Sequence, residues 1–332
     1  MTTLYVDRRG VELKVNGDAL VFFENGARVG TVPLNPLSRI FLRGDVGLSS
    51  SLLAKLGELN IGVVVLSGRK AIPTMLLGRP HNDAARRIAQ YRLSQDDSFC
   101  LKFAMRLVAA KLQSQKLFLS AQREQSPMSR YVLTHACKII ENAIASVSKQ
   151  NSMAALRGVE GAAAATYFGA YAELCPPRYQ FSHRNRRPPK DPINAVLSLG
   201  YTLLHAEAVL AAYGAGIDPF IGFYHALDFG RESLACDIVE PLRADVDSHT
   251  LNLFRSEILR TDDFSFNNDA CLMGKAGRVR FYTEWQRVAE GLRKKLEEQV
   301  SDLTQLMARN EPVSKVVACS STANTERPAD LS

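Results

Sequence analysis

Early in the chain, Val11-Glu-Leu-Lys-Val15 is followed by Asn16-Gly17 and then by Leu20-Val-Phe-Phe23. Apolar and polar residues alternate in the first segment, as they do along a strand that buries one face. Asn16-Gly17 and Asn25-Gly26 flank the second segment, and Asn-Gly is the dipeptide most typical of two-residue hairpin turns. The pattern predicts two successive β-hairpins and a β-rich beginning of the chain.

The rest of the first eighty residues continues this character. We expect further strands at Ile40–Leu42, Val63–Leu66 and Ile72–Leu77, with one short helix at Ser49–Leu59. Gly78-Arg-Pro80 then interrupts the pattern, because glycine and proline break regular structure. We therefore predict a small β-rich N-terminal domain over residues 1–79.

From Asp83 onward, apolar residues recur at helical intervals. The pattern predicts helices at 128–149, 152–174, 192–213, 231–240 and 277–308. We expect an α+β protein in which a larger all-helical domain covers residues 80–309. Residues 310–332 are rich in Ser, Thr, Asn and Pro and lack apolar periodicity, so we expect a disordered tail.

Composition narrows the classes of protein that fit. The chain has 332 residues and a net charge of +7, from 41 Lys and Arg against 34 Asp and Glu, which favours a polyanionic partner. Its six cysteines lack zinc-site spacing, which indicates reduced thiols in a cytoplasmic protein. We expect no membrane association, because no secretory leader and no apolar run of spanning length stand out. Phosphate-binding glycine loops, dinucleotide fingerprints and nucleophile elbows are also missing from the sequence.

One group of residues is typical of metal chemistry. His225 ends Gly222-Phe-Tyr-His225, and Asp237 and Glu240 follow on one face of an expected helix. Two carboxylates so close repel each other unless a cation lies between them. A divalent ion satisfies this requirement, but so does Arg243, three residues beyond Glu240, and Asp228 competes as a ligand.

A further acidic residue, Glu160, lies far upstream of this group, in a segment of small residues that we expect to be helical. Glu160 follows Arg157 and stands between Gly158 and Gly161, which allow another backbone or a ligand to approach closely. With His225 and Glu240, it completes a mixed nitrogen and oxygen ligand set. The alternative is a surface ion pair between Arg157 and Glu160.

The loop 178–190 carries positive charge and no acid. Its basic residues suit phosphate contacts, and Tyr179 and Phe181 between them are of the type that supports a base or a sugar. A solvated basic loop is the alternative. With Arg157, we expect the DNA-binding residues to include Arg178, Arg184, Arg186, Arg187 and Lys190.

Four ordered motifs together resemble a known family. They are Arg157-Gly-Val-Glu160-Gly-Ala-Ala, the run from Arg186-Arg-Pro-Pro-Lys through Asn194 to Tyr201, Gly222-Phe-Tyr-His225, and Leu234-Ala-Cys-Asp237-Ile-Val-Glu240-Pro-Leu-Arg243. This order is similar to that of the CRISPR-associated endonuclease/integrase of spacer acquisition, the first of the universal CRISPR-associated proteins. The resemblance covers residues 1 to about 308.

The resemblance implies a fold, partners and a site. It implies a β domain joined to a helical catalytic domain, a homodimer, and a complex with the small ferredoxin-like CRISPR adaptation protein. It also implies that Glu160, His225 and Glu240 bind Mg²⁺ or Mn²⁺, and that Asp237 is a further catalytic residue that tunes the site or holds a second ion. The last ligand is Asp in some members of the family and Glu here.

The implied activity is phosphoryl transfer on double-stranded DNA, both protospacer and CRISPR repeat. A 3′-hydroxyl or water attacks, and captured fragments are inserted into a CRISPR array during antiviral defence. Two alternatives remain from the residues alone. One is a non-catalytic DNA-binding scaffold whose acids pair with Arg157 and Arg243, and the other is a metal phosphoesterase acting on another nucleic acid.

Overall fold

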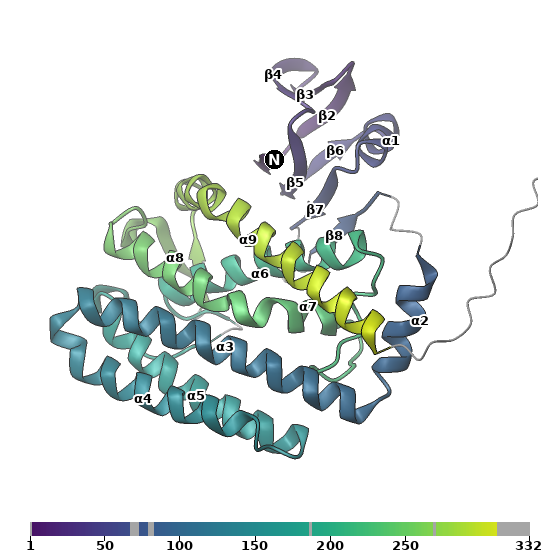
Figure 1. The fold of residues 1–332 in the computed structure, drawn as a ribbon. Helices are drawn as coiled ribbons and strands as arrows, with labels where there is room; N and C mark the ends of the chain where they lie inside the picture. The colour runs from purple at the N-terminus through teal and green to yellow at the C-terminus, as the bar shows by residue number, and fades with distance from the viewer. Residues whose placement is uncertain (1, 67–72, 79–82, 186–187, 268–269, 311–332) are drawn as a thin grey trace, which may run out of the picture.

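The computed structural model describes residues 2–66, 73–78, 83–185, 188–267 and 270–310. The strands of the N-terminal part are β1 (Thr2–Asp7), β2 (Val11–Asn16), β3 (Ala19–Glu24), β4 (Ala27–Pro33), β5 (Leu37–Arg43), β6 (Val46–Leu48), β7 (Gly62–Val65) and β8 (Thr74–Leu76). The helix α1 (Ser50–Glu58) lies between β6 and β7, and Ser49 caps its first turn. The α+β class is therefore confirmed, with β structure gathered at the beginning of the chain (Figure 1).

The two predicted hairpins form one of the sheets. Its strand order is β4-β3-β2-β6, and both the β2–β3 and the β3–β4 pairs are antiparallel. At the second turn, Asn25 and Gly26 have φ of 51° and 79°. Two successive positive φ angles define the turn that Asn-Gly favours, so this turn chemistry fixes the register of the hairpin.

The other N-terminal sheet joins this region to the rest of the protein. Its order is β1-β5-β7-β8, with β1, β5 and β7 parallel and β8 antiparallel. Side chains alternate between its faces: Ile40 and Leu42 belong to a small core with the hairpin sheet, whereas Phe41 belongs to the large core of the helices. The two regions therefore pack on opposite faces of one sheet.

The larger part is built from α2 (Ala84–Leu93), α3 (Asp97–Gln125), α4 (Arg130–Val147), α5 (Met153–Leu174), α6 (Pro192–Gly214), α7 (Ser233–Val239), α8 (Arg243–Arg255) and α9 (Lys275–Arg309). Short 3-10 turns connect several of them: η1 (Pro127–Ser129), η2 (Pro177–Tyr179), η3 (Glu240–Leu242) and η4 (Thr261–Asp263). The predicted helices are present, with ends shifted by a few residues. The part is not all helical, however, because β9 (Phe264–Asn267) and β10 (Ala270–Met273) form an antiparallel hairpin before α9.

Helix starts follow the polar residues that precede them. The Asp96 side chain accepts hydrogen bonds from the backbone N–H groups of Ser98 and Phe99 and caps α3. Asp191 caps α6 in the same way through the N–H of Asn194. Such caps satisfy backbone donors that the first turn of a helix leaves unpaired. In Figure 1, α3, α4 and α5 form one layer, and α6, α7, α8 and α9 lie against it.

Polar and aromatic contacts fix α9 to the N-terminal sheet. The Tyr5 ring stacks on Tyr282 with centroids 4.6 Å apart, and Gln286 donates to the Thr3 carbonyl at 2.8 Å. Buried Glu207 on α6 forms one ion pair with Arg39 of the sheet, at 3.4 Å, and another with Arg293 of α9, at 3.5 Å. Glu207 thereby connects the sheet to α9. These contacts hold the β-rich region against the helices that carry the site.

Helix α6 corrects one expectation from the sequence. By length and composition, Pro192–Gly214 is apolar enough to cross a membrane, contrary to our prediction that no such segment exists. In the fold, 61% of its most apolar window is buried inside the protein. Its apolar character is that of a central core helix, which is covered by neighbouring helices.

Candidate active site

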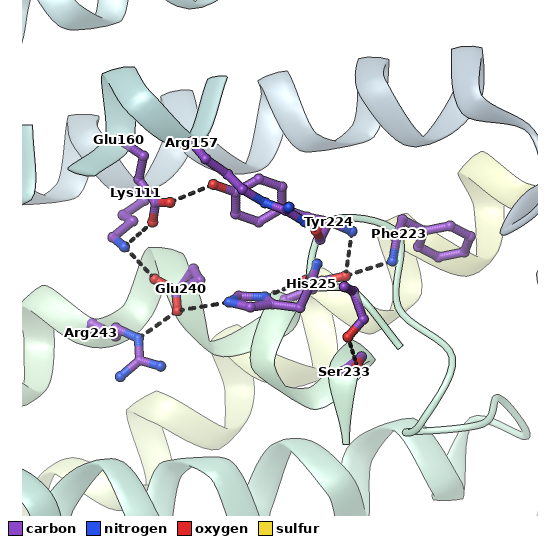
Figure 2. A network of polar contacts seen from close by, with 11 residues as sticks. Lys111, Arg157, Glu160, Phe223, Tyr224, His225, Ser233, Glu240 and Arg243 are labelled. Atoms are coloured by element: carbon purple, nitrogen blue, oxygen red, sulfur yellow. Dashed lines mark hydrogen bonds and ion pairs between the residues drawn. The ribbon is translucent and has the colours of Figure 1, made fainter. Parts of the chain in front are cut away.

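Three distant segments meet beside the middle of α3. Glu160 extends from α5, His225 from the loop between α6 and α7, and Glu240 from the start of η3 (Figure 2). Lys111, from α3, lies between the two glutamates. The structure therefore brings together the three residues that the sequence predicted as ligands and adds a lysine.

Lys111 bridges the carboxylates. Its Nζ donates to Glu160 Oε1 in a very short contact and lies 2.6 Å from Glu240 Oε2. Only 12% of the Lys111 side chain is exposed. Burial alone would lower the pKa of Lys111, but Glu240 and Glu160 outweigh burial and raise it. Lys111 is therefore protonated and places a positive charge at the centre of the group.

Glu240 is the most buried acid of the group, with 5% of its side chain exposed. Arg243 Nε donates to Glu240 Oε1 at 2.8 Å, and Lys111 approaches the other oxygen. Burial favours the neutral form, but Arg243 and Lys111 oppose it and lower the pKa of Glu240 to about 2. Glu240 is consequently ionised at neutral pH.

Asp237 holds His225 in place. Its Oδ1 is 2.7 Å from His225 Nδ1 and accepts the backbone N–H of His225 at 2.9 Å. Its Oδ2 accepts the N–H groups of Phe223 and Tyr224 at 2.8 and 3.1 Å. With Nδ1 donating to Asp237, the Nε2 lone pair of His225 faces the site, 4.0 Å from Glu240 Oε1.

The glycine before this loop has a steric reason. A Cβ at Gly222 would lie 2.8 Å from Asp237 Oδ2 and 2.8 Å from the Ser233 carbonyl carbon. Only glycine allows the backbone to approach the carboxylate so closely. The Gly222-Phe-Tyr-His225 motif therefore folds around Asp237 and delivers the imidazole to the site.

Glu160 is held by Tyr224 as well as by Lys111. The Tyr224 hydroxyl donates to Glu160 Oε2 in a very short contact, and burial and then Glu160 raise the pKa of that hydroxyl. Arg157 donates to the Tyr224 carbonyl at 2.9 Å and lies over the Tyr224 ring. The geometry thus places Arg157 on Tyr224 and not in the alternative Arg157–Glu160 surface pair, and the expected contact of Arg157 with DNA stays a prediction.

The environment of Asp237 favours one of the two roles that we expected for it, tuning the site, over holding a second ion. Its side chain is fully buried, and its two oxygens already accept four hydrogen bonds. A carboxylate with this many partners has no lone pair left for a second ion. Asp237 therefore acts as a positioning residue for His225. Asp228, the competing ligand, is exposed and accepts the N–H of Phe229 in its own loop.

The donor set suits a hard or borderline divalent cation. Two ionisable carboxylates and one imidazole nitrogen face one another, and each is oriented by a further partner, as metal ligands usually are. Within the described ranges, no three His, Cys, Asp or Glu side chains are arranged to hold an ion as they stand. The Lys111 ammonium lies in the space between the two carboxylates. The residues fit a metal ion provided that this ammonium moves.

The basic loop is folded onto α6 by buried Asn194. The Asn194 side chain accepts from Arg184 at 2.7 Å and from the Asn185 N–H at 3.0 Å, and it donates to the His183 carbonyl at 2.9 Å. The guanidinium of Arg184 lies over the ring of Tyr201, 5.3 Å from its centroid.

Tyr201 connects this loop to the site. The guanidinium of Arg243 also lies over the Tyr201 ring, at 4.7 Å, and Arg243 binds Glu240. The Tyr201 ring is held in place by its hydroxyl, which donates to Asp247. Positive charge therefore runs from the loop to the site.

The loop aromatics do not serve as the sequence suggested. Tyr179 and Phe181 are 2% and 8% exposed, and they pack against Phe254 and Tyr171 in the core. Buried rings offer no face to a base or a sugar, so this expectation is wrong. The two side chains instead anchor the loop.

The remaining basic residues have different settings. Arg178 is half exposed and pairs with Glu257 at 2.8 Å, and Lys190 is exposed. Arg186 and Arg187 lie outside the described residues, as does the expected tail beyond residue 310. Among the described basic residues of the loop, Arg178 and Lys190 present charge to solvent.

Comparison with known proteins now adds to this geometry. The family model described as CRISPR associated protein Cas1 matches residues 4–287. A CRISPR-associated endonuclease Cas1 from Thermodesulfovibrio yellowstonii is 39% identical over 290 residues, which are 86% of this chain and 91% of that protein.

The chain belongs to the Cas1 family.

Solved structures share the Cas1 fold. A Cas1 protein from Thermotoga maritima superposes with a TM-score of 0.80 at 22% identity, covering 93% of this chain and 97% of that one. A casposase bound to its integration product superposes with a TM-score of 0.77 at 24% identity, covering 92% and 91%. The predicted family resemblance and the order of the two parts of the fold are confirmed.

Sequence reasoning missed two residues of this Cas1 site. Lys111 lies in a stripe of α3 whose other members, including Val108, Leu112 and Gln115, are buried. A lysine within such a stripe is the signal that was available, because lysine is rarely buried without a partner. Tyr224 stands beside His225 in the motif, but nothing in its spacing indicates that its hydroxyl turns to Glu160.

Proposed function

We propose that this Cas1 family protein is a metal-dependent DNA endonuclease and integrase that inserts captured DNA fragments into a CRISPR array. The observation that carries the proposal is the meeting of Glu160 and Glu240 on one cation, with His225 Nε2 turned toward them. The name of its relative, an endonuclease, supports the same reaction class.

Glu160, His225 and Glu240 would hold the metal, Mg²⁺ or Mn²⁺. An imidazole among carboxylates suits Mn²⁺ at least as well as Mg²⁺. When bound, such an ion polarises the scissile phosphate and stabilises the charge on the leaving 3′-oxygen. Little covalent chemistry then falls to the protein, so positioning and charge neutralisation dominate.

The side chains around the ligands supply that positioning. Asp237 fixes the tautomer and the direction of His225, and Arg243 keeps Glu240 ionised. Arg184 and Arg243 place positive charge on both sides of the route from the loop to the site through Tyr201. A DNA backbone lying along this route would bring a phosphodiester to the carboxylates, where water or a DNA 3′-hydroxyl attacks.

The partners are part of the same proposal. We expect the chain to work in the cytoplasm as a homodimer, in which residues 1–79 form the dimer interface, and to bind the small ferredoxin-like CRISPR adaptation protein. Two solved structures of the same fold support a CRISPR-associated protein partner and DNA: one is a Cas6-RT-Cas1–Cas2 complex with a TM-score of 0.76, and another is a Cas1–DNA complex with a TM-score of 0.61. Double-stranded DNA, as protospacer and repeat, is the expected substrate.

A strand-transfer assay tests the activity. The wild-type chain, the small partner and a linear duplex with free 3′-hydroxyl ends are incubated with a repeat-bearing plasmid in Mn²⁺ or in EDTA. We expect the wild type to integrate the duplex in Mn²⁺ and not in EDTA. We expect no integration by Glu160→Ala or His225→Ala in either condition, although both variants still bind DNA. Integration by either variant at the wild-type rate would contradict the assignment.

One observation favours a second candidate, the non-catalytic DNA-binding scaffold. Lys111 and Arg243 neutralise Glu240 without any metal, and Lys111 also pairs with Glu160. A scaffold would bind DNA equally well in EDTA and would neither nick nor join it. The other alternative, a metal phosphoesterase, is separated by competition among short RNA, duplex DNA and branched DNA in the same reaction.

A further inference from the structure

Lys111 has an unusual position for a lysine. Its side chain comes from the middle of α3, is almost fully enclosed, and touches the two acids proposed as metal ligands (Figure 2). Elsewhere on the same helix, Lys116 pairs with Glu141 at 2.9 Å with both side chains far more exposed. Lys111 therefore belongs to the site and is not part of the surface charge.

The ammonium lies between the two carboxylate oxygens that a bridging ion would use. Lys111 Nζ approaches Glu160 Oε1 and Glu240 Oε2, one oxygen of each acid. Each of the other two oxygens accepts one hydrogen bond, from Tyr224 and from Arg243. A divalent ion bridging Glu160 and Glu240 therefore has to replace Lys111 or lie against it, and two cations at that distance repel strongly.

The charge balance leads to the same result. Glu160 and Glu240 carry two negative charges, and Lys111 and Arg243 carry two positive charges, so the group is neutral as it stands. A divalent ion added without movement would leave an excess charge of two in a mostly buried site, which is costly. Withdrawal of the one flexible cation, which sits on a four-carbon stem, relieves half of that excess.

We propose that Lys111 is a built-in substitute for the divalent ion: its ammonium holds Glu160 and Glu240 together in the metal-free protein and leaves them when an ion binds. The inference rests on the proposed function, because it takes this site to be the metal site. It adds that metal affinity is set partly by competition from the protein's own lysine.

The test compares Lys111→Met with the matched control Lys116→Met, in the full-length chain. Methionine keeps a long flexible side chain of similar length and removes the charge. Mn²⁺ affinity is measured by electron paramagnetic resonance of free Mn²⁺, and thermal unfolding is measured in EDTA and in saturating Mn²⁺. Neither measurement depends on catalysis.

We expect opposite effects on stability and affinity. Without metal, Lys111→Met removes the cation that the two carboxylates share, leaving Glu160 with Tyr224 and Glu240 with Arg243, and lowers the melting temperature; Mn²⁺ restores most of the loss. If Lys111 occupies the site more than nine-tenths of the time, its removal tightens Mn²⁺ binding about tenfold or more. Lys116→Met changes neither quantity.

A purely structural lysine gives another result. In that case Lys111→Met loses the same stability with and without Mn²⁺, and its Mn²⁺ affinity equals or falls below that of the wild type. This outcome overturns the inference and leaves the metal site intact. Failure of both the wild type and Lys111→Met to bind Mn²⁺ overturns the proposed function as well, so the two failures are distinguishable.

A measurement on the wild type covers the case in which Lys111→Met does not fold. Reductive methylation followed by mass spectrometry reports how accessible each lysine amine is, and Lys116 serves as the internal reference. We expect Lys111 to be protected in EDTA and to react several-fold faster in Mn²⁺. Equal reactivity of Lys111 in the two conditions would overturn the inference.

Discussion

Replacing Asp237 with Asn tests how the site is built. The two carboxylate oxygens accept four hydrogen bonds, from three backbone N–H groups and His225 Nδ1. An amide keeps one accepting oxygen, so at least two of these donors lose their partner whichever way the amide turns. Each orphaned buried donor costs about 1–3 kcal/mol, so we expect Asp237→Asn to lower the free energy of unfolding by about 2–6 kcal/mol.

The same substitution acts on the metal site. Loss of the partner that orients a ligating histidine typically weakens metal binding by about 10–100-fold. Urea unfolding and Mn²⁺ titration at neutral pH measure the two effects, with Asp228→Asn as the control, because exposed Asp228 accepts one local hydrogen bond. Unfolding within about 0.5 kcal/mol of the wild type, together with unchanged Mn²⁺ affinity, would refute the reasoning.

Three other perturbations probe neighbouring features. Gly222→Ala places a Cβ 2.8 Å from Asp237 Oδ2 and should destabilise the fold by about 1–3 kcal/mol in urea unfolding, whereas Gly169→Ala, with nothing within 4 Å, should be neutral or stabilising. The folded-state pKa of Glu240 is about 2 and its ordinary value is 4.5. Its contribution to the free energy of unfolding is therefore complete above pH 4.5 and is lost as the pH falls toward 2. Acid should lower the stability of Glu240→Gln less steeply than that of the wild type, and identical pH profiles would exclude this contribution. Arg178→Ala should leave the free energy of unfolding unchanged. It should make the slope of log DNA affinity against log salt concentration shallower by about 0.9, and an unchanged slope would show that Arg178 does not contact a DNA phosphate.

Local sequence patterns predicted those parts of the fold that local chemistry decides. Asn25-Gly26 forms the second hairpin turn as predicted, whereas the first loop is Gly17-Asp18, one residue later than Asn16-Gly17, because Asn16 pairs with Ala19. Apolar periodicity predicted most helices. The parallel pairing of β1 with β5 was not predictable from the sequence. Residues 8–36 separate the two strands, and no local signal specifies their register. Helix α8 was missed because Asp247 lies on its buried face and interrupts the apolar pattern. The buried carboxylate of Asp247 accepts hydrogen bonds from the hydroxyls of Tyr167 and Tyr201.

The site shows the same limit. Motif order identified Glu160, His225 and Glu240, and the structure brings them together. Asp237 orients His225, whereas Glu240 is the proposed metal ligand. This difference depends on which carboxylate oxygens already accept hydrogen bonds, and residue spacing does not contain that information. Lys111 comes from a helix that none of the four motifs includes, so only the packing of α3 against α5 and η3 reveals it.

The most direct test of the account is strand transfer by the wild type and by His225→Ala, compared in Mn²⁺ and in EDTA with the small partner present. The account predicts joined product for the wild type in Mn²⁺ only, and none for His225→Ala although it still binds the DNA. Equal joining by His225→Ala, or joining by the wild type in EDTA, would contradict the claim that Glu160, His225 and Glu240 hold a catalytic metal ion.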